Sequence, residues 1–334
     1  MKRRTFLQFS SASLASMLTG ASGYLAWQPR AHAATITRTF YITDGFIRQP
    51  DGVNVYFRGF SNSTGSLNVP GDAIIAQEND TVRITIVNTR GTSHNFTVQG
   101  QGVNVSIPAG SQRTVEFTAR NPGSYLYYDA SNAPYNRIVG LHGGLAVMPQ
   151  GSNNELYDGS RTFRKQLFWV FNDIDPAWND RIRNGSTPST AFKPRYFTIN
   201  GLSSRPPGAP GHDDPRVDAF ADPSSKLHGR VGDRTLIRLL NAGMCDHSVH
   251  WHGNHVEWLS RNGQIRSDVW NKDTLYLPRN LGRLDAIYPF QQPPDAWPRV
   301  STGHYVMHLH DEMTQTAGGG LYQFGAATHI EFEG

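Results

Sequence analysis

Hydrophobic and polar residues alternate along most of the chain from about residue 34 onward. The pattern is clear at residues 36–42 and 53–60. It returns in short stretches separated by Gly, Asn, Asp and Pro, at 81–88, 113–117, 124–128, 165–171, 196–201, 234–241 and 328–332. Alternation with a period of two predicts β-strands, and no useful stretch has the 3.6-residue period of a helix. The sequence therefore predicts an all-β protein built from antiparallel β-sandwiches.

A polar, glycine-containing stretch at residues 150–162 separates two groups of predicted strands. We therefore expect a first domain at 34–150 and a second at 151–334, in which residues 202–225 form a long surface loop. The two halves also share a pattern, because residues 80–88 align without a gap on residues 233–241. The same offset places His94 on His247 and Gly100 on Gly253, which indicates an internal duplication.

Residues 1–33 have the pattern of a twin-arginine signal peptide. Arg3 and Arg4 precede a weakly apolar Ser/Ala/Leu run, and small residues form a cleavage site at Ala31-His32-Ala33. The apolar run is short and rich in Ser and Gly, which argues against a membrane span, and an uncleaved anchor is the alternative. We therefore expect a periplasmic protein, exported by a route that commonly carries folded proteins with their cofactors.

The signal peptide also accounts for the charge of the chain. It contains Lys2, Arg3, Arg4 and Arg30 and no acidic residue, which equals the formal net charge of +4 of the whole sequence. Because the remainder is formally neutral, we expect no nucleic-acid partner and no anionic membrane partner. The single cysteine, Cys245, excludes an intrachain disulfide.

Two histidine-rich runs lie in the C-terminal half. Residues 247–255 read HSVHWHGNH and residues 304–310 read HYVMHLH, and together they hold seven of the 13 histidines. In an extended strand, side chains two positions apart point to the same face, roughly 6–7 Å apart, so each run offers one His-x-His pair. The competing interpretation is core or solvated histidines without a metal. Two facing pairs predict a metal centre suited to copper, zinc, iron or nickel, formed by His250, His252, His308 and His310.

The chain resembles the multicopper oxidase and copper nitrite reductase superfamily over nearly its whole length after the signal peptide. The most specific stretches are residues 197–201 (FTING), 241–253 and 305–310 (YVMHLH). The resemblance implies two tandem cupredoxin-like Greek-key β-sandwiches and a copper cofactor. It places His247 at the position of the type 1 copper ligand. The positions of the type 2 and type 3 copper ligands correspond to His250, His252, His308 and His310.

The sequence also departs from this family. Leu309 replaces the cysteine that binds type 1 copper, and Thr314 replaces the type 1 histidine that follows it. Leucine offers no lone pair, so we expect no blue copper site. In the first domain, His94 takes the type 1 position, and Thr97 and Gln99 stand where the cluster histidines would be. The four retained imidazoles suit about one to two copper ions per chain.

Further side chains complete the site if the fold brings them near, namely His94, His142, His247, His255 and His304. His255 has odd parity relative to His252, so we expect it to face elsewhere or to support a ligand. Cys245 either joins a rearranged Cys-His-Met site, with Met244, Met307 or Met313, or is a small buried thiol. The group Tyr127, Tyr128 and Asp129 either replaces lost ligands or packs in the core.

Three functions are compatible with these residues. The first is a periplasmic copper oxidoreductase with a histidine-only, type 2/type 3-like centre, which acts on a small-molecule substrate or on oxygen. Its electrons come from a small-molecule substrate or from a donor protein. The second is a copper-binding, storage or tolerance protein without turnover, and the third is a metal-free cupredoxin scaffold. The resemblance further implies a homotrimer, in which Thr97, Gln99 and Tyr128 face the histidines of the neighbouring chain, and a site at the interface between the two domains of one chain is the alternative.

Overall fold

The computed structural model describes residues 24–25, 30–152, 154–292, 302–317, 321–322 and 325–333. Most ordered elements within these ranges are β-strands, which confirms the predicted all-β fold. Arg3, Arg4 and most of the predicted signal peptide lie outside the described residues. Across the described part of the chain, none of the helices has the length and apolar character needed to cross a membrane.

The first half of the chain forms a four-stranded sheet, in the order β2-β1-β4-β7, and a five-stranded sheet, in the order β3-β9-β8-β5-β6. Between the two sheets lies a core that includes Phe40, Phe60, Phe96 and Tyr127. The strands are β1 (Thr35–Arg48), β2 (Asn54–Ser61), β3 (Gly71–Gln77), β4 (Thr81–Asn88), β5 (His94–Val98), β6 (Val103–Ile107), β7 (Gln112–Thr118), β8 (Gly123–Tyr128) and β9 (His142–Met148).

The second half forms a six-stranded sheet, in the order β11-β10-β13-β18-β15-β16, and a five-stranded sheet, in the order β12-β22-β19-β14-β17. The first of these sheets contains β10 (Lys165–Ile174), β11 (Tyr196–Ile199), β13 (Thr235–Asn241), β15 (Val256–Arg261), β16 (Gln264–Lys272) and β18 (Arg283–Tyr288). The second contains β12 (Leu227–Gly229), β14 (His247–Trp251), β17 (Thr274–Leu277), β19 (Gly303–Leu309) and β22 (Ala327–Phe332). β20 (Thr316–Ala317) and β21 (Leu321–Tyr322) pair antiparallel in a separate two-stranded sheet.

The sheets are mixed rather than purely antiparallel, which corrects the expectation from the sequence. β1 pairs in parallel with β4, and β10 pairs in parallel with β13 at the equivalent place in the second half. Parallel neighbours require a crossover connection, and local alternation of hydrophobic and polar residues carries no information about such a connection.

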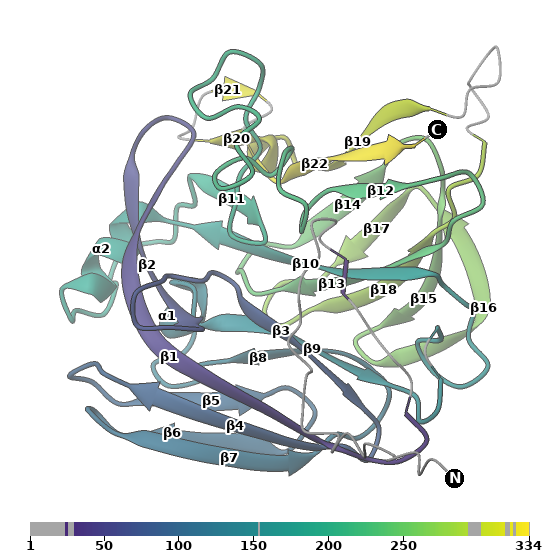
Figure 1. Cartoon of the computed structure of the whole chain (residues 1–334). Helices are drawn as coiled ribbons and strands as arrows, with labels where there is room; N and C mark the ends of the chain where they lie inside the picture. Colours follow the sequence, from purple (N-terminus) through teal and green to yellow (C-terminus); the bar gives the residue numbers. More distant parts are fainter. Residues whose placement is uncertain are drawn as a thin grey trace, which may run out of the picture.

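The two halves pack together through an apolar interface. Phe168, Leu236 and Leu240 from the six-stranded sheet share a buried cluster with Leu126 and Met148 from the first half. In Figure 1 most strands of the first half lie in the lower part of the molecule, although β1 and β2 rise along its left side, and β10, β13 and β18 of the second half lie above the sheet that contains β3, β8 and β9. This arrangement leaves the outer face of the sheet that contains β14 and β19 away from the interface.

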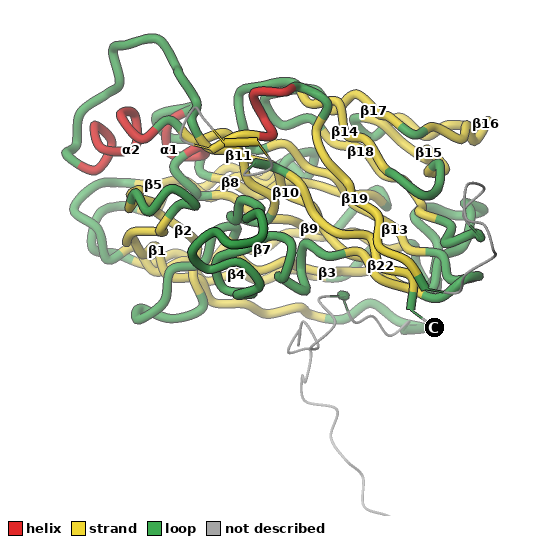
Figure 2. The backbone as a smooth tube through the Cα atoms, turned by 90° about the horizontal axis from the view of Figure 1, so that it is seen from above, coloured by secondary structure: helices red, strands yellow, loops and turns green. Residues whose placement is uncertain are grey.

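Within the described residues, three short helical segments interrupt the strands: α1 (Tyr135–Ile138), α2 (Pro176–Arg183) and the 3₁₀ segment Glu312–Gln315. α2 is a helix that the hydrophobic pattern did not predict, although Asp175 caps its backbone N–H groups and Pro176 occupies the first turn. Figure 2 shows that α1 and α2 lie at one end of the molecule and β16 at the other.

Candidate metal centre

The candidate ligands lie on two neighbouring antiparallel strands, β14 and β19. His250 is directly opposite His308 in the register, between the pairs Val249↔Leu309 and Trp251↔Met307. Two further hydrogen bonds extend the pairing, because the His310 N–H donates to the Ser248 carbonyl and the His252 N–H to the Val306 carbonyl. The histidines therefore occupy opposite and diagonal positions on one face of the sheet.

The alternation of the two strands explains which way these side chains point. Val249, Trp251, Met307 and Leu309 are almost completely buried in the core of the second sandwich. Residues on either side of them in sequence must point to the opposite, outer face. Trp251 is thus a core residue, as expected from its position between two histidines.

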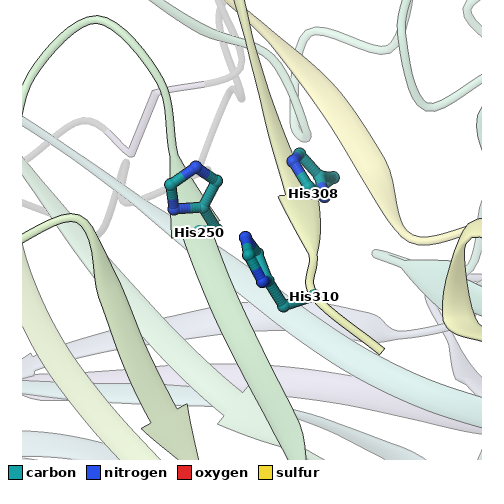
Figure 3. A group of neighbouring side chains, drawn as sticks. All are labelled: His250, His308 and His310. Atoms are coloured by element: carbon teal, nitrogen blue, oxygen red, sulfur yellow. The ribbon is translucent and has the colours of Figure 1, made fainter. Parts of the chain in front are cut away.

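The four imidazole rings gather on that outer face. The ring centre of His250 lies 4.7 Å from that of His252, 5.3 Å from that of His308 and 4.6 Å from that of His310. The His308 ring lies 5.3 Å from His252 and 5.4 Å from His310. Figure 3 shows His250, His308 and His310 converging between their two strands. The spatial convergence expected from strand parity is therefore present.

The ring nitrogens of the group lie close to one another. His250, His308 and His310 each offer a nitrogen within 4.8 Å of the other two, and the Nε2 atoms of His252 and His308 are 3.2 Å apart. The Nδ1 atom of His308 lies 3.1 Å from the Leu309 carbonyl, and the Nδ1 atom of His250 lies 3.0 Å from the Asp273 carbonyl. Carbonyl oxygens only accept hydrogen bonds, so both Nδ1 atoms carry the proton and both Nε2 atoms keep a lone pair.

The environment favours neutral imidazoles. Partial burial, followed by the charges that His252 and His310 carry when protonated, lowers the pKa of His250 and of His308 below the ordinary value. A neutral imidazole is the form that binds a metal ion. The residues present therefore suit a transition-metal ion with nitrogen ligands.

A cleft of about 550 Å³ opens beside His250 and His252. Its lining is polar and includes the side chains of Asn254, Asp273 and Gln291, and it contains no lysine or arginine among the described residues. His255 also lines this cleft and is exposed, so it adjoins the candidate centre without joining the ligand group. A small molecule in the cleft would lie next to two candidate ligands.

The structure does not bring the remaining candidate histidines to this group. His94 is buried in the first sandwich with its Nδ1 atom 2.5 Å from Asp129 Oδ2. His247 is buried at the start of β14, and its Nε2 atom lies 3.1 Å from Asp173 Oδ1, in a geometry too poorly aligned for a hydrogen bond. His94 and His247, the two histidines expected at type 1 positions, therefore each lie beside a buried carboxylate.

The other two candidates are also elsewhere. His142 is buried at the start of β9, where its Nδ1 atom lies 2.8 Å from the Arg137 carbonyl. His304 lies on the same face of β19 as His308 but is about three-quarters exposed, with its Nδ1 atom 3.8 Å from Glu331 Oε1. His304 is two alternate positions away from His308, which separates it from the group.

Cys245 is half-buried and packs against the core of the second sandwich. Burial and the nearby Asp173 carboxylate raise the pKa of its thiol to about 12, so the thiol stays protonated at neutral pH. Of the methionines considered with it, Met307 is buried on the inner face and Met313 is largely exposed. This arrangement favours the interpretation of Cys245 as a structural thiol.

In the first sandwich, Thr97 lies directly opposite Tyr128 in the pairing of β5 and β8. Gln99 donates a hydrogen bond from its side-chain amide to the Leu281 carbonyl, 2.9 Å away in the second half of the same chain. Tyr127 is fully buried in the first core, where it stacks on Phe40 and Phe96. Tyr127 is thus a packing residue, and Asp129 is the partner of His94.

A second group of potential ligands was not predicted from the sequence. His212, Asp213 and Asp218 approach one another in the long loop after β11. The Asp218 carboxylate, however, already accepts backbone N–H bonds from Arg205, Asp213 and Phe220, and the His212 Nδ1 atom lies 2.8 Å from the Arg205 carbonyl. These contacts stabilise the loop, and the histidine lacks the His-x-His spacing that signals a ligand pair.

Comparison with known proteins places this geometry in context. Residues 66–152 match the family model described as multicopper oxidase. The copper-containing nitrite reductase of Pseudomonas chlororaphis is 22% identical over 290 residues, which cover 80% of this chain and 71% of that protein. The copper-containing nitrite reductase of Alcaligenes xylosoxydans xylosoxydans is 23% identical over 271 residues, covering 74% and 75%.

Solved structures show the same fold. The multicopper oxidase mgLAC superimposes with a TM-score of 0.69 at 22% identity, covering 89% of this chain and 86% of that one. The copper nitrite reductase of Nitrosomonas europaea superimposes with a TM-score of 0.63 at 18% identity, covering 90% and 94%. The chain is therefore similar to multicopper oxidases and copper nitrite reductases, and it has the cupredoxin β-sandwich fold of these solved structures.

Proposed function

We propose that this protein is a periplasmic copper-binding oxidoreductase, exported by the twin-arginine route, whose metal centre consists of His250, His252, His308 and His310. The observation that carries the proposal is the gathering of four imidazoles on the open face of one strand pair. Two of their Nε2 atoms are 3.2 Å apart. Core packing accounts for the inner face of these strands and gives no reason for four histidines on the outer one.

Copper is the metal that the donor set and the relatives favour together. Imidazole nitrogen suits copper in both of its common oxidation states, and it also suits zinc, iron and nickel. The similar nitrite reductases are named as copper-containing proteins, which supports copper among these metals. Four imidazoles suit about one to two ions per chain.

The reaction we propose is limited to chemistry at this centre. Leu309 and Thr314, at the positions of type 1 ligands, are buried and offer no thiolate or imidazole. Electrons would then enter from a small-molecule reductant bound in the adjoining cleft or from a donor protein that docks close to the centre. A bound copper ion would supply redox chemistry and open coordination positions for oxygen or substrate.

Assembly is part of the proposal. The outer face of β14 and β19 is open in the single chain, and a homotrimer would cover it with a neighbouring chain. Sedimentation of the mature protein at several concentrations measures this directly. A monomer that retains copper at the four histidines would remove the trimer from the proposal and leave the metal centre in place.

The central test is copper content per chain in natively exported protein. We expect about one to two ions in the wild type and none in the double variant His250→Ala/His308→Ala. The matched control is His304→Ala, which removes a histidine from the same face of the same strand. Equal copper content in the double variant and the wild type would contradict the proposed site.

A second measurement separates an enzyme from a copper store. Oxygen uptake by the copper-loaded protein with a phenol or Cu(I) as reductant is expected to exceed that of the double variant. A fully loaded protein that shows no uptake would favour storage or tolerance without turnover. Native protein without any metal would favour the scaffold interpretation.

A further inference from the structure

The buried carboxylate of Asp80 holds the start of the first strand. Its side chain is completely buried, and its Oδ1 atom accepts a hydrogen bond from the Ala34 backbone N–H at 2.7 Å. Its Oδ2 atom accepts the Gln77 backbone N–H at 2.6 Å and forms an ion pair with the guanidinium of Arg30. A buried carboxylate without a cation is strongly destabilising, so Arg30 has a clear structural role in this chain.

Ala34 is held in place by the fold on its other side as well. The Thr81 N–H donates to the Ala34 carbonyl at 2.9 Å, and the parallel pairing of β1 with β4 begins at the next residue. Residues 31–33 are exposed immediately before this anchored position. These are the small residues Ala31-His32-Ala33 of the predicted cleavage site.

The second half of the chain contains an equivalent buried carboxylate, and its positively charged partners come from a different part of the chain. Asp233, which aligns with Asp80, is also buried, and its Oδ1 atom lies 3.1 Å from Arg164 Nη1. Its Oδ2 atom lies 3.4 Å from Lys165 Nζ and accepts the Arg230 backbone N–H at 3.0 Å. In the second half the cations thus belong to the start of β10. In the first half the cation belongs to Arg30, upstream of the predicted cleavage site.

We propose that cleavage between Ala33 and Ala34 creates a new N-terminus and that the Asp80 carboxylate binds it. Hydrolysis of that peptide bond by a peptidase adds one water, leaving a carboxylate on Ala33 and an ammonium group on Ala34. The Ala34 nitrogen already lies 2.7 Å from Asp80 Oδ1. Cleavage therefore replaces the Arg30–Asp80 ion pair with an α-ammonium–Asp80 ion pair, and the buried carboxylate keeps a cation.

This inference rests on the export signal in the proposed function and is independent of the metal centre. The structure also offers a competing outcome. Tyr24 is buried against the second sandwich, and its hydroxyl group contacts the backbone carbonyl and N–H of His228. The Leu25 N–H donates to the Gln166 carbonyl of β10 at 2.9 Å. A mature chain that kept these contacts would also keep Arg30.

The N-terminal sequence and intact mass of the exported protein distinguish the two outcomes. We expect mature chains that begin at Ala34. Chains that retain Tyr24 and Arg30 after export would overturn the proposal, because Arg30 would then remain the cation of Asp80. Copper content, measured on the same samples, reports separately on the metal centre.

Chemical labelling tests the ion pair itself in the mature protein. An ion pair raises the pKa of an amine. When the pKa rises by one, only about one-tenth of the reactive neutral form remains at a pH below the pKa. We expect the Ala34 α-amine to react about tenfold more slowly in the folded protein than in the unfolded protein at pH 7. Asp80→Asn should restore fast labelling, and Asp233→Asn is the matched control that should not.

A variant with one glycine added before Ala34 keeps Asp80 and moves the ammonium group by up to about 3.5 Å. We expect fast labelling and a lower Tm, by on the order of 5 °C, because the buried carboxylate loses its cation. In the uncleaved chain, Arg30→Gln should lower Tm similarly. A glycine-extended protein with unchanged Tm and a protected amine would overturn the proposal, even if Asp80→Asn fails to fold.

Discussion

His250 and His308 are directly opposite each other in the antiparallel pairing of β14 and β19, with ring centres 5.3 Å apart. The diagonal neighbours His252 and His310 flank this pair on the same face of the sheet. Side chains directly opposite on a strand pair are held at a separation fixed by the backbone. The central pair is therefore positioned by the sheet itself.

The variant His252→Ala should weaken copper binding without affecting the fold. Its Nε2 atom lies 3.2 Å from His308 Nε2, so a shared ion would lose one ligand. We expect copper affinity to fall by at least about 10–100-fold, the loss typical even of residues that only orient a ligand. The unfolding free energy of the metal-free protein should change by less than about 0.5 kcal/mol because this side chain is exposed.

Competition with a chelator of known affinity measures the copper dissociation constant, and urea unfolding of the metal-free protein measures stability. His255→Ala is the control, because His255 lines the adjoining cleft but is outside the ligand group. Equal affinity losses in the two variants would contradict the assignment of His252 as a ligand.

The copper-loaded wild type should show no intense blue absorption band. Leu309 is completely buried in the apolar core, and His247 lies beside Asp173. A type 1 centre requires a cysteine thiolate together with histidine ligands. The absorption spectrum of the loaded protein tests this, and an intense blue band would show that Cys245 binds copper despite the raised pKa of its thiol.

Stability should fall between pH 7 and pH 5 through the titration of His142. Burial lowers the pKa of His142 from 6.5 to about 4. The unfolded chain therefore binds a proton in this range that the folded chain does not, and stability decreases as the pH falls through 6.5 toward 4. This group contributes a loss of about 2 kcal/mol between pH 7 and pH 5.

His142→Asn keeps an N–H donor for the Arg137 carbonyl and removes the titration. We expect the difference between its unfolding free energies at pH 7 and pH 5 to be about 2 kcal/mol smaller than that of the wild type. Denaturant unfolding at the two pH values provides the comparison. Parallel pH profiles for the two proteins would show that His142 does not carry this dependence.

The interface between the two halves contains a buried charged network. The guanidinium of Arg238 donates to the Ser124 hydroxyl and to the Gln166 side-chain oxygen, and the Ser124 hydroxyl donates to the Asp285 carboxylate. Arg238→Met leaves Asp285 without this cation and should cost about 3–5 kcal/mol of unfolding free energy.

The double variant Arg238→Met/Asp285→Leu should recover part of that stability, since it removes both buried charges. A double-mutant cycle of unfolding free energies measures the coupling between the two residues. Simple addition of the two single losses would show that the charges do not interact through Ser124.

The sequence predicted the parts of the site that depend on strand parity. Alternation at His250 and His308 predicted both the buried inner face and the shared outer face. The carboxylate partners of His94 and His247 were not predicted. Asp129, which directly follows β8, and Asp173 of β10 lie 35 and 74 residues away from them in sequence, and no local pattern encodes such contacts.

Short elements were also beyond the hydrophobic pattern. The eight residues of α2 span only about two turns, too few for a helical period to appear. The pair Asp175 and Pro176 was the available signal, because it combines a capping residue with a proline in the first turn. Arg30 shows a further limit, since its ion pair with Asp80 assigns a structural role to a residue that the sequence places in a cleaved segment.

The separation of hydrophobic residues and histidines onto opposite faces of β14 and β19 has a consequence for protein engineering. Fold and candidate ligands are specified by different residues of the same backbone, so donor atoms can be exchanged on the solvent side while the hydrophobic positions stay constant. A series that replaces His310 by aspartate, cysteine or methionine would compare metal preferences on one unchanged scaffold. Differences in selectivity within such a series would report the chemistry of a single donor.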